Sequence, residues 1–131
     1  MSENAEIVRS ILAAWGTGDV EQMVRSIAAE AELLPLRAQL EGTAYRGPGG
    51  MRQFWEDLNA DWEDLRLPIS ELRERGDSVV AICRLTARGR ASGVDIDVRI
   101  GTLWELRDGE VMRLESFSDP ADALRGAGLD E

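Results

Sequence analysis

The side chains that could carry out chemistry in this chain are carboxylates, arginines and hydroxyls, together with one tyrosine, Tyr45, and one cysteine, Cys83. The 131 residues include no histidine, and all fifteen basic residues are arginines. The lack of histidine excludes Ser-His and Cys-His nucleophile pairs and imidazole metal ligands. The lack of lysine excludes a Schiff base and a P-loop lysine. Because arginine stays protonated, any side-chain general base would have to be a carboxylate.

Hydroxyl-bearing and aromatic residues on two apolar runs are the best candidates for contacts with a ligand. Thr102 and Trp104 share the apolar face of one alternating run, and Ser116 shares that of the next. Hydroxyls on such a face orient a ligand in some proteins and bond only to neighbouring backbone in others. Arg84 and Thr86 on the preceding run are further candidates for such contacts.

Two interpretations of Arg84 remain open. An arginine that faces the pocket would need a carboxylate or an anionic ligand beside it. The alternate face of its run is more apolar, which favours an Arg84 in water or at a dimer interface. That apolar face carries Val79, Ala81, Cys83, Leu85 and Ala87. Cys83 is accordingly expected to be a buried, inert thiol, because no histidine or lysine is available to lower its pKa.

Asp95 and Asp97, close to Arg99, have the spacing of a paired-carboxylate site. Strand alternation favours another interpretation, a charge ladder on the exposed face of the sheet. The other members of this ladder would be Arg88, Arg113 and Glu115. Two surface carboxylates are too few for a divalent ion, and one thiol without histidine cannot form a zinc cluster. The sequence therefore predicts no metal site and no cofactor.

The composition is typical of a single soluble domain that spans residues 1–131. Apolar residues make up 44% and charged residues 31%, and the net charge is −10. That charge repels phosphates and anionic lipids, so neither nucleic acid nor a membrane is an expected partner. A lone cysteine cannot form an intramolecular disulfide, and the acidic N-terminal segment does not resemble a signal peptide. A cytoplasmic location is the expectation.

The first half of the chain predicts three helices. Apolar residues repeat at helical spacing from about residue 4 to 15 and stop at a Gly-Thr-Gly sequence. Asp19 is suited to cap a second helix, since Gln22 stands three residues later as in a capping box. A third helix is predicted to begin at Gly47-Pro48, with an apolar stripe that extends to Trp62.

Period-two alternation replaces the helical spacing in the second half of the chain. Four runs begin at Leu65, Val79, Val94 and Val111, and Gly-containing turns separate them. Two runs of about a dozen residues exceed the usual strand length, so the sheet must bend strongly or contain a bulge. Additional predicted features are a brief strand at 31–36, an irregular loop through Gly42, an extended stretch at Tyr45 and a short helix from Pro120. These elements predict an α+β fold, a conical barrel in which a strongly curved antiparallel sheet wraps three N-terminal helices, followed by a short C-terminal helix.

Three segments resemble the SnoaL-like family of the nuclear-transport-factor-like superfamily, which has a cystatin-like α+β cone. They are ILAAWGTGDVEQMV, AYRGPGGMRQFW and IGTLWELRDGEVMRLESFSD, and the resemblance covers about residues 5–127. The superfamily also contains ketosteroid isomerases, limonene epoxide hydrolases and polyketide cyclases. The resemblance implies a homodimer packed through the sheet and an apolar pocket between the concave sheet face and the helices. Fold does not determine function in such a superfamily.

Most catalytic positions of the related enzymes are occupied by other residue types here. The base, the tyrosine and the second acid of a ketosteroid isomerase correspond to Pro35, Ile11 and Thr102. The first-strand tyrosine and asparagine of a limonene epoxide hydrolase correspond to Leu33 and Pro35, and its Asp-Arg-Asp set to Thr86, Arg84 and Ser116. Since only the arginine matches, neither activity is expected.

Three hypotheses about function follow. The first is a small-molecule-binding protein that holds a small apolar or weakly polar ligand, with Arg84, Thr86, Thr102, Trp104 and Ser116 in the wall of the cone. The second is an isomerase, cyclase or hydrolase that uses a non-standard carboxylate such as Glu32, Glu41 or Glu115. The third is a structural dimer whose cone is filled with side chains. A homodimer through the charged outer face of the sheet is expected.

Overall fold

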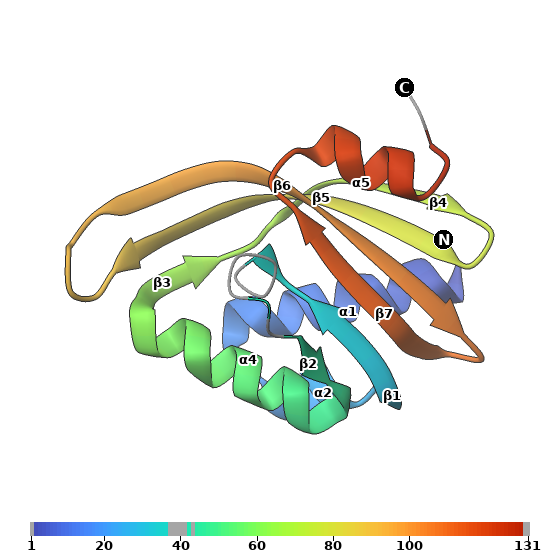
Figure 1. The fold of residues 1–131 in the computed structure, drawn as a ribbon, viewed down its shortest axis with the longest axis horizontal. Helices are drawn as coiled ribbons and strands as arrows, with labels where there is room; N and C mark the ends of the chain where they lie inside the picture. Colours follow the sequence, from blue (N-terminus) through green and yellow to red (C-terminus); the bar gives the residue numbers. More distant parts are fainter. Residues whose placement is uncertain (1, 37–41, 43, 130–131) are drawn as a thin grey trace.

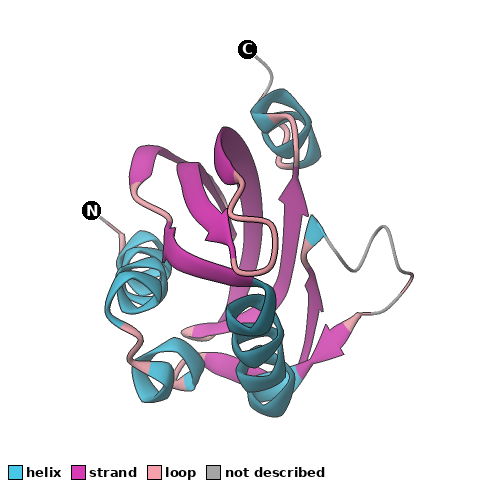
Figure 2. Ribbon diagram, turned by 90° about the vertical axis from the view of Figure 1, so that its left-hand side faces the viewer, coloured by secondary structure: helices cyan, strands magenta, loops and turns pink. Residues whose placement is uncertain are grey.

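A strongly curved sheet with helices on both sides forms the molecule (Figure 1). The computed structural model describes residues 2–36, 42 and 44–129. Helices α1, α2 and α4 lie on the concave side of the sheet, and α5 lies on the convex side (Figure 1). A view from the side shows the sheet curling around the first three helices (Figure 2). This is the α+β cone that the sequence predicted.

Local capping signals explain where the helices begin and end. Helix α1 spans Glu3–Thr17, with the Ser2 hydroxyl accepting a hydrogen bond from the Ala5 N–H at its start. Helix α2 is short, Val20–Val24, and Asp19 caps it as predicted by accepting from the Gln22 N–H at 3.2 Å. Helix α4 spans Gly47–Asp61 and helix α5 spans Pro120–Gly126, each with a proline in its first turn.

The strands pair in the order β2-β1-β7-β6-β5-β3, and β4 pairs with the remaining part of the β5 edge. Their bounds are β1 Ile27–Leu34, β2 Tyr45–Arg46, β3 Trp62–Arg66, β4 Ile69–Arg75, β5 Ser78–Gly89, β6 Asp95–Arg107 and β7 Glu110–Phe117. The run predicted from Leu65 to Ile69 is divided at Pro68, which cannot donate to a sheet ladder, into β3 and β4. Most of the irregular loop predicted before Gly42 lies outside the described residues.

Every strand pair is antiparallel as predicted except one, since β1 runs parallel to β7. Leu33 is the partner of Leu114 in that parallel pair. The two strands are far apart in the sequence and are not joined by a hairpin, so no turn forces them to be antiparallel.

Trp62 was predicted on the apolar stripe of the third helix, and the structure corrects this. Helix α4 ends at Asp61, and Trp62 is the first residue of β3. Between Glu63 and Arg66 the pairing of β3 with β5 slips by one residue, and Asp64 has a φ of 56°. This β-bulge places Trp62 and Leu65, which are three residues apart, on the same concave face.

The two faces of the long strands have different partners. Strands β5 and β6 have 12 and 13 residues. Val79, Ala81 and Cys83 pack against the concave-side helices, while Val80 and Ile82 pack under α5. A Cβ at Gly101 would lie 2.7 Å from the Ala123 Cβ, so this glycine lets α5 approach β6 closely.

Candidate functional site

A cavity of about 310 Å³ lies between the concave face of the sheet and helices α1 and α4. Its walls are aliphatic and aromatic, and none of the described residues that line it carries a formal charge. The lining residues are Leu12, Trp15, Pro35, Leu36, Phe54, Leu58, Trp62, Leu65, Leu67, Leu85, Ala87, Ile96, Ile100, Thr102, Trp104, Leu114 and Ser116. The volume is at the lower end of the range of about 300–1,000 Å³ that is usual for small-molecule sites.

Two neighbouring hydroxyl residues form the polar part of this wall. Thr102 on β6 is directly opposite Ser116 on β7, and both are buried. Thr102 lies at the same time opposite Ala81 on β5, and its hydroxyl donates to the Ala81 carbonyl at 3.0 Å. The Trp104 indole N–H donates to the Thr102 hydroxyl at 2.8 Å. Thr102 thus connects the tryptophan to the backbone of the neighbouring strand.

Aromatic rings cover the helical side of the cavity. The rings of Trp15 and Phe54 are 5.3 Å apart, and both line the cavity. Trp15 also meets Trp55 edge-on at 5.0 Å. Trp15 therefore packs onto helix α4 and also contributes to the cavity wall.

The five predicted pocket residues divide into two groups. Thr102, Trp104 and Ser116 line the cavity, whereas Arg84 and Thr86 do not. Arg84 points to the convex side, where its side chain is 59% exposed and forms an ion pair with Asp97. Thr86 lies in a separate, open depression on that side among charged residues such as Arg88. The placement of Arg84 and Thr86 in the cone wall is thus corrected, because regular alternation along β5 turns Leu85 and Ala87 inward instead.

Asp95 and Asp97 form ion pairs on the convex face, as predicted, but of the predicted ladder members only Arg88 is a partner, since Arg113 binds Glu32 and Glu115 instead. Arg88 binds Asp95 with 2.9 Å between Nε and Oδ1, and Arg84 binds Asp97. The hydrogen bond from Arg84 lowers the pKa of Asp97 below its ordinary value. Among the described residues, no three carboxylate or thiol side chains are grouped so that they could hold a metal ion.

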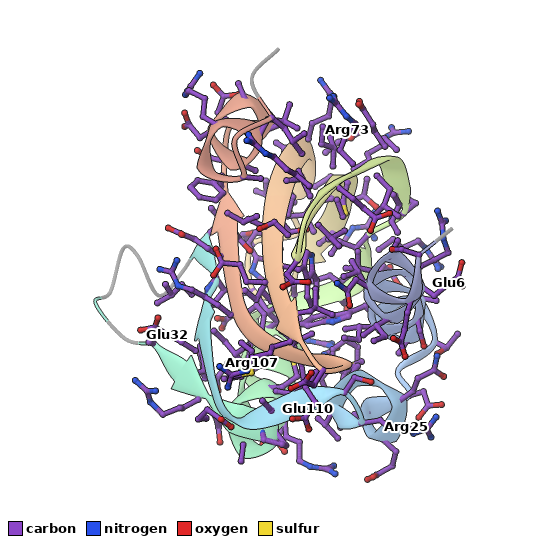
Figure 3. The ribbon with its side chains drawn as sticks, turned by 90° about the vertical axis from the view of Figure 1, so that its right-hand side faces the viewer. Glu6, Arg25, Glu32, Arg73, Arg107 and Glu110 are labelled. Atoms are coloured by element: carbon purple, nitrogen blue, oxygen red, sulfur yellow. The ribbon has the colours of Figure 1, made fainter. Side chains whose placement is uncertain are left out.

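Two of the three carboxylates considered as non-standard catalytic groups, Glu32 and Glu115, do not line the cavity. Glu32 binds Arg113 with 3.2 Å between Oε1 and Nε, and Arg113 also binds Glu115 at 3.3 Å. Both glutamates therefore belong to the charged surface of β1 and β7, and Figure 3 shows Glu32 at the periphery of the molecule. Glu41, the third candidate, lies outside the described residues.

Cys83 is fully buried on the concave-facing side of β5. Burial raises the pKa of its thiol to about 11. A thiol with this pKa stays protonated at neutral pH and is a poor nucleophile.

In the part of the chain that the structure describes, no helix has the length and apolar composition needed to cross a membrane.

Most of the cavity wall consists of apolar residues that the sequence analysis did not select, such as Leu12, Leu58 and Leu85. In the sequence these residues belong to the apolar stripes of the two long helices and of the alternating strands. Such a stripe does not show whether a given residue packs tightly in the core or lines a cavity, since both kinds of residue are apolar and buried.

Comparisons with known proteins agree on one fold. Residues 8–114 match the family model of the SnoaL-like domain, and no curated protein matches the chain. An NTF2-like protein of Burkholderia thailandensis superposes with a TM-score of 0.81 at 23% identity, over 95% of this chain and 98% of that one. A Jannaschia protein named as a SnoaL-like polyketide cyclase gives a TM-score of 0.78 at 23% identity, with coverages of 98% and 93%. TerC, co-crystallised with polyporic acid, gives 0.80 at 22% identity, with coverages of 96% and 98%.

Proposed function

This chain belongs to the family of SnoaL-like domains, and on that premise we propose that it binds a small, uncharged and mainly apolar molecule in its cavity. The observation that carries the proposal is the partly open space of about 310 Å³ with an apolar wall. Side chains in a well-packed core leave few voids larger than a water molecule. A space of this size beside two buried hydroxyls, Thr102 and Ser116, suits a ligand better than it suits a filled core.

The distribution of charge supports an uncharged ligand. A charged group in a cavity without a partner would lose its hydration without compensation. Two arginines that adjoin lining residues in the sequence, Arg84 and Arg113, are bound to carboxylates on the other face of the sheet. The ligand therefore obtains its binding energy from apolar contacts, with a single polar group facing the hydroxyl pair.

An isomerase, cyclase or hydrolase of the same fold is the alternative function. Two similar proteins, from Jannaschia and from Sinorhizobium meliloti, are named as polyketide cyclases, which supports considering it. Catalysis in this chain would require an acid or a base at the cavity. Because Glu32 and Glu115 are engaged by Arg113 away from the lining, the described carboxylates support ligand binding rather than acid–base catalysis.

Two neighbouring residues on opposite faces of β5 allow a matched test. Ala87 lines the cavity and Thr86 faces the convex side. We expect Ala87→Trp to fill the cavity and to abolish binding of N-phenyl-1-naphthylamine, a neutral apolar fluorophore excited at wavelengths where tryptophan does not absorb. Thr86→Trp adds the same ring outside the cavity and should leave the affinity unchanged. Equal probe binding by wild-type protein and a folded Ala87→Trp variant, checked by circular dichroism, would contradict the proposal.

A further inference from the structure

The hydrogen bonds of Thr102 determine which kind of polar group the cavity can accept. Thr102 is 3% exposed and Trp104 is 1% exposed, so water does not compete effectively for their polar atoms. Trp104 Nε1 lies 2.8 Å from Thr102 Oγ1, and Thr102 Oγ1 lies 3.0 Å from the Ala81 carbonyl oxygen. These two distances leave one consistent arrangement of protons.

An indole nitrogen is a donor only, so the Thr102 oxygen must accept from Trp104. A carbonyl oxygen is an acceptor only, so the single hydroxyl proton of Thr102 must point to Ala81. The Thr102 oxygen then has one lone pair left and no proton to give. Towards the cavity, Thr102 therefore acts as an acceptor.

We propose that Thr102 gives the cavity a preference for one kind of ligand, a proposal that rests on the ligand site proposed above. Neutral apolar ligands that carry a hydroxyl or N–H donor should bind more tightly than matched ligands that carry only an acceptor. A ligand donor can use the remaining lone pair of Thr102 without disturbing Trp104 or Ala81. A ligand carbonyl or ether can bind Thr102 only if its hydroxyl proton turns away from Ala81, which breaks a buried hydrogen bond. Ser116 stands opposite Thr102 and also lines the wall, so its effect has to be separated by its own variant.

The test compares two probes with the same ring system, 2-naphthol as the donor and 2-methoxynaphthalene as the acceptor, with naphthalene as the apolar reference. Affinities are measured by equilibrium dialysis for the wild type, Thr102→Val, Thr102→Ser and Ser116→Ala. Thr102→Val keeps the shape of the side chain and removes the hydroxyl. Thr102→Ser keeps the hydroxyl and is the matched control.

We expect Thr102→Val to lower the affinity for 2-naphthol by about three- to tenfold, the range for one buried hydrogen bond. The affinity for 2-methoxynaphthalene should change less than about twofold. Thr102→Ser and Ser116→Ala should keep the wild-type ratio of the two affinities. An unchanged ratio in Thr102→Val would overturn the inference while naphthalene binding still supports the ligand site. Failure of all three probes to bind the wild type would overturn the ligand site and the inference with it.

A measurement on the wild type keeps the inference testable if Thr102→Val does not fold. The indole N–H of Trp104 reports on the oxygen that it binds. Its ¹H–¹⁵N NMR signal should shift further with 2-naphthol than with 2-methoxynaphthalene, because only the phenol adds a second donor to Thr102. Equal shifts from the two probes, whose rings are the same, would count against the inference.

Discussion

Arg84 and Asp97 form a two-pronged ion pair across β5 and β6 on the convex face of the sheet. Arg84 Nε lies 2.8 Å from Asp97 Oδ1, and Nη2 lies 2.5 Å from Oδ2. The pair is diagonal, since the residue directly opposite Arg84 is Arg99. Both side chains are more than half exposed, which limits the contribution of the pair to stability. An arginine that resembled a catalytic residue in the sequence is therefore part of the outer surface.

Arg84→Ala should leave the affinity for a neutral apolar probe unchanged, because Arg84 does not line the cavity. The thermal midpoint at neutral pH should also change little, since the pair is solvated on both sides. The depressed pKa of Asp97 means that the small stabilisation by the pair is present at neutral pH and is lost as the pH falls through that pKa. Probe titration and thermal melts at pH 7 and pH 3 check this. A large loss of probe affinity at pH 7 would place Arg84 at the ligand site.

Arg99→Glu should weaken a homodimer formed through the convex face. Arg99 has no ion-pair partner among the described residues and stands opposite another arginine. Because Arg84 is already bound to Asp97, Arg99 carries a positive charge that is unpaired within the described part of the chain. On a protein of net charge −10, this charge is complementary to the carboxylates of a second copy. Sedimentation velocity should show a dimer for the wild type and a dissociation constant raised by about tenfold or more in the variant.

Arg9→Glu, on the exposed side of α1, changes the net charge equally and should leave the dimer intact. A wild-type protein that stays monomeric at all concentrations would show that no such dimer forms. Equal weakening by both charge reversals would point to net charge rather than to the convex face.

Cys83 should not react with a disulfide reagent at pH 8 until the protein unfolds, because its pKa of about 11 keeps the thiol protonated and burial blocks access. The unfolded thiol titrates near 9.0. Above that pH the unfolded state loses a proton that the folded state keeps, so stability falls as the pH rises from about 9 through 11. The slope for one proton is at most about 1.4 kcal/mol per pH unit. Urea titrations of wild type and Cys83→Ala between pH 8 and 10.5 should diverge, and parallel curves would contradict the assignment.

Arg90→Ala should loosen the end of the β5–β6 hairpin beside the cavity. Arg90 donates through Nε to the Asn59 carbonyl at 2.5 Å, and its backbone N–H donates to the Asp61 carbonyl at 2.9 Å. Its Nη1 also lies 3.4 Å from Glu63 Oε1. Removing the side-chain contacts should lower the free energy of unfolding by about 1 kcal/mol and should speed probe release. Arg90→Lys, which keeps the charge without the planar fork, should give an intermediate value in urea denaturation.

Turnover of epoxides or of a 5-ene-3-ketosteroid should not exceed the buffer background. The positions that carry the required carboxylates in those enzymes hold Pro35, Thr86, Thr102 and Ser116, and neither proline nor a hydroxyl takes a proton at neutral pH. Product analysis by chromatography checks this expectation. A turnover that Glu115→Gln or Glu32→Gln abolishes would replace the binding proposal with catalysis by a non-standard carboxylate.

Local features of the fold could be predicted from the sequence, because they depend on interactions between near neighbours. Asp19 capped α2 as its spacing to Gln22 predicted. Alternation separated the two faces of β5, and the excess length of β5 and β6 predicted a bent or bulged sheet. Three sequence segments resembled the SnoaL-like family, and the family model that matches residues 8–114 shows the same family. Thr102, Trp104 and Ser116 were selected because they share the apolar faces of two alternating runs, and all three line the cavity.

Tertiary structure decided the features that depend on contacts between distant segments. Trp62 fits a helical stripe by spacing, but pairing with Gly89 and the bulge at Asp64 make it part of β3. The parallel pairing of β1 with β7 joins strands that no turn connects. Alternation favoured an outward Arg84 whereas the family resemblance favoured an inward one, and the packing of the other face of β5 against the helices turned it outward. Short-range sterics and the periodicity of side chains are local properties, which the sequence displays directly. Which face of a strand lies on the concave side is not local, because it depends on which apolar surfaces the whole chain buries together.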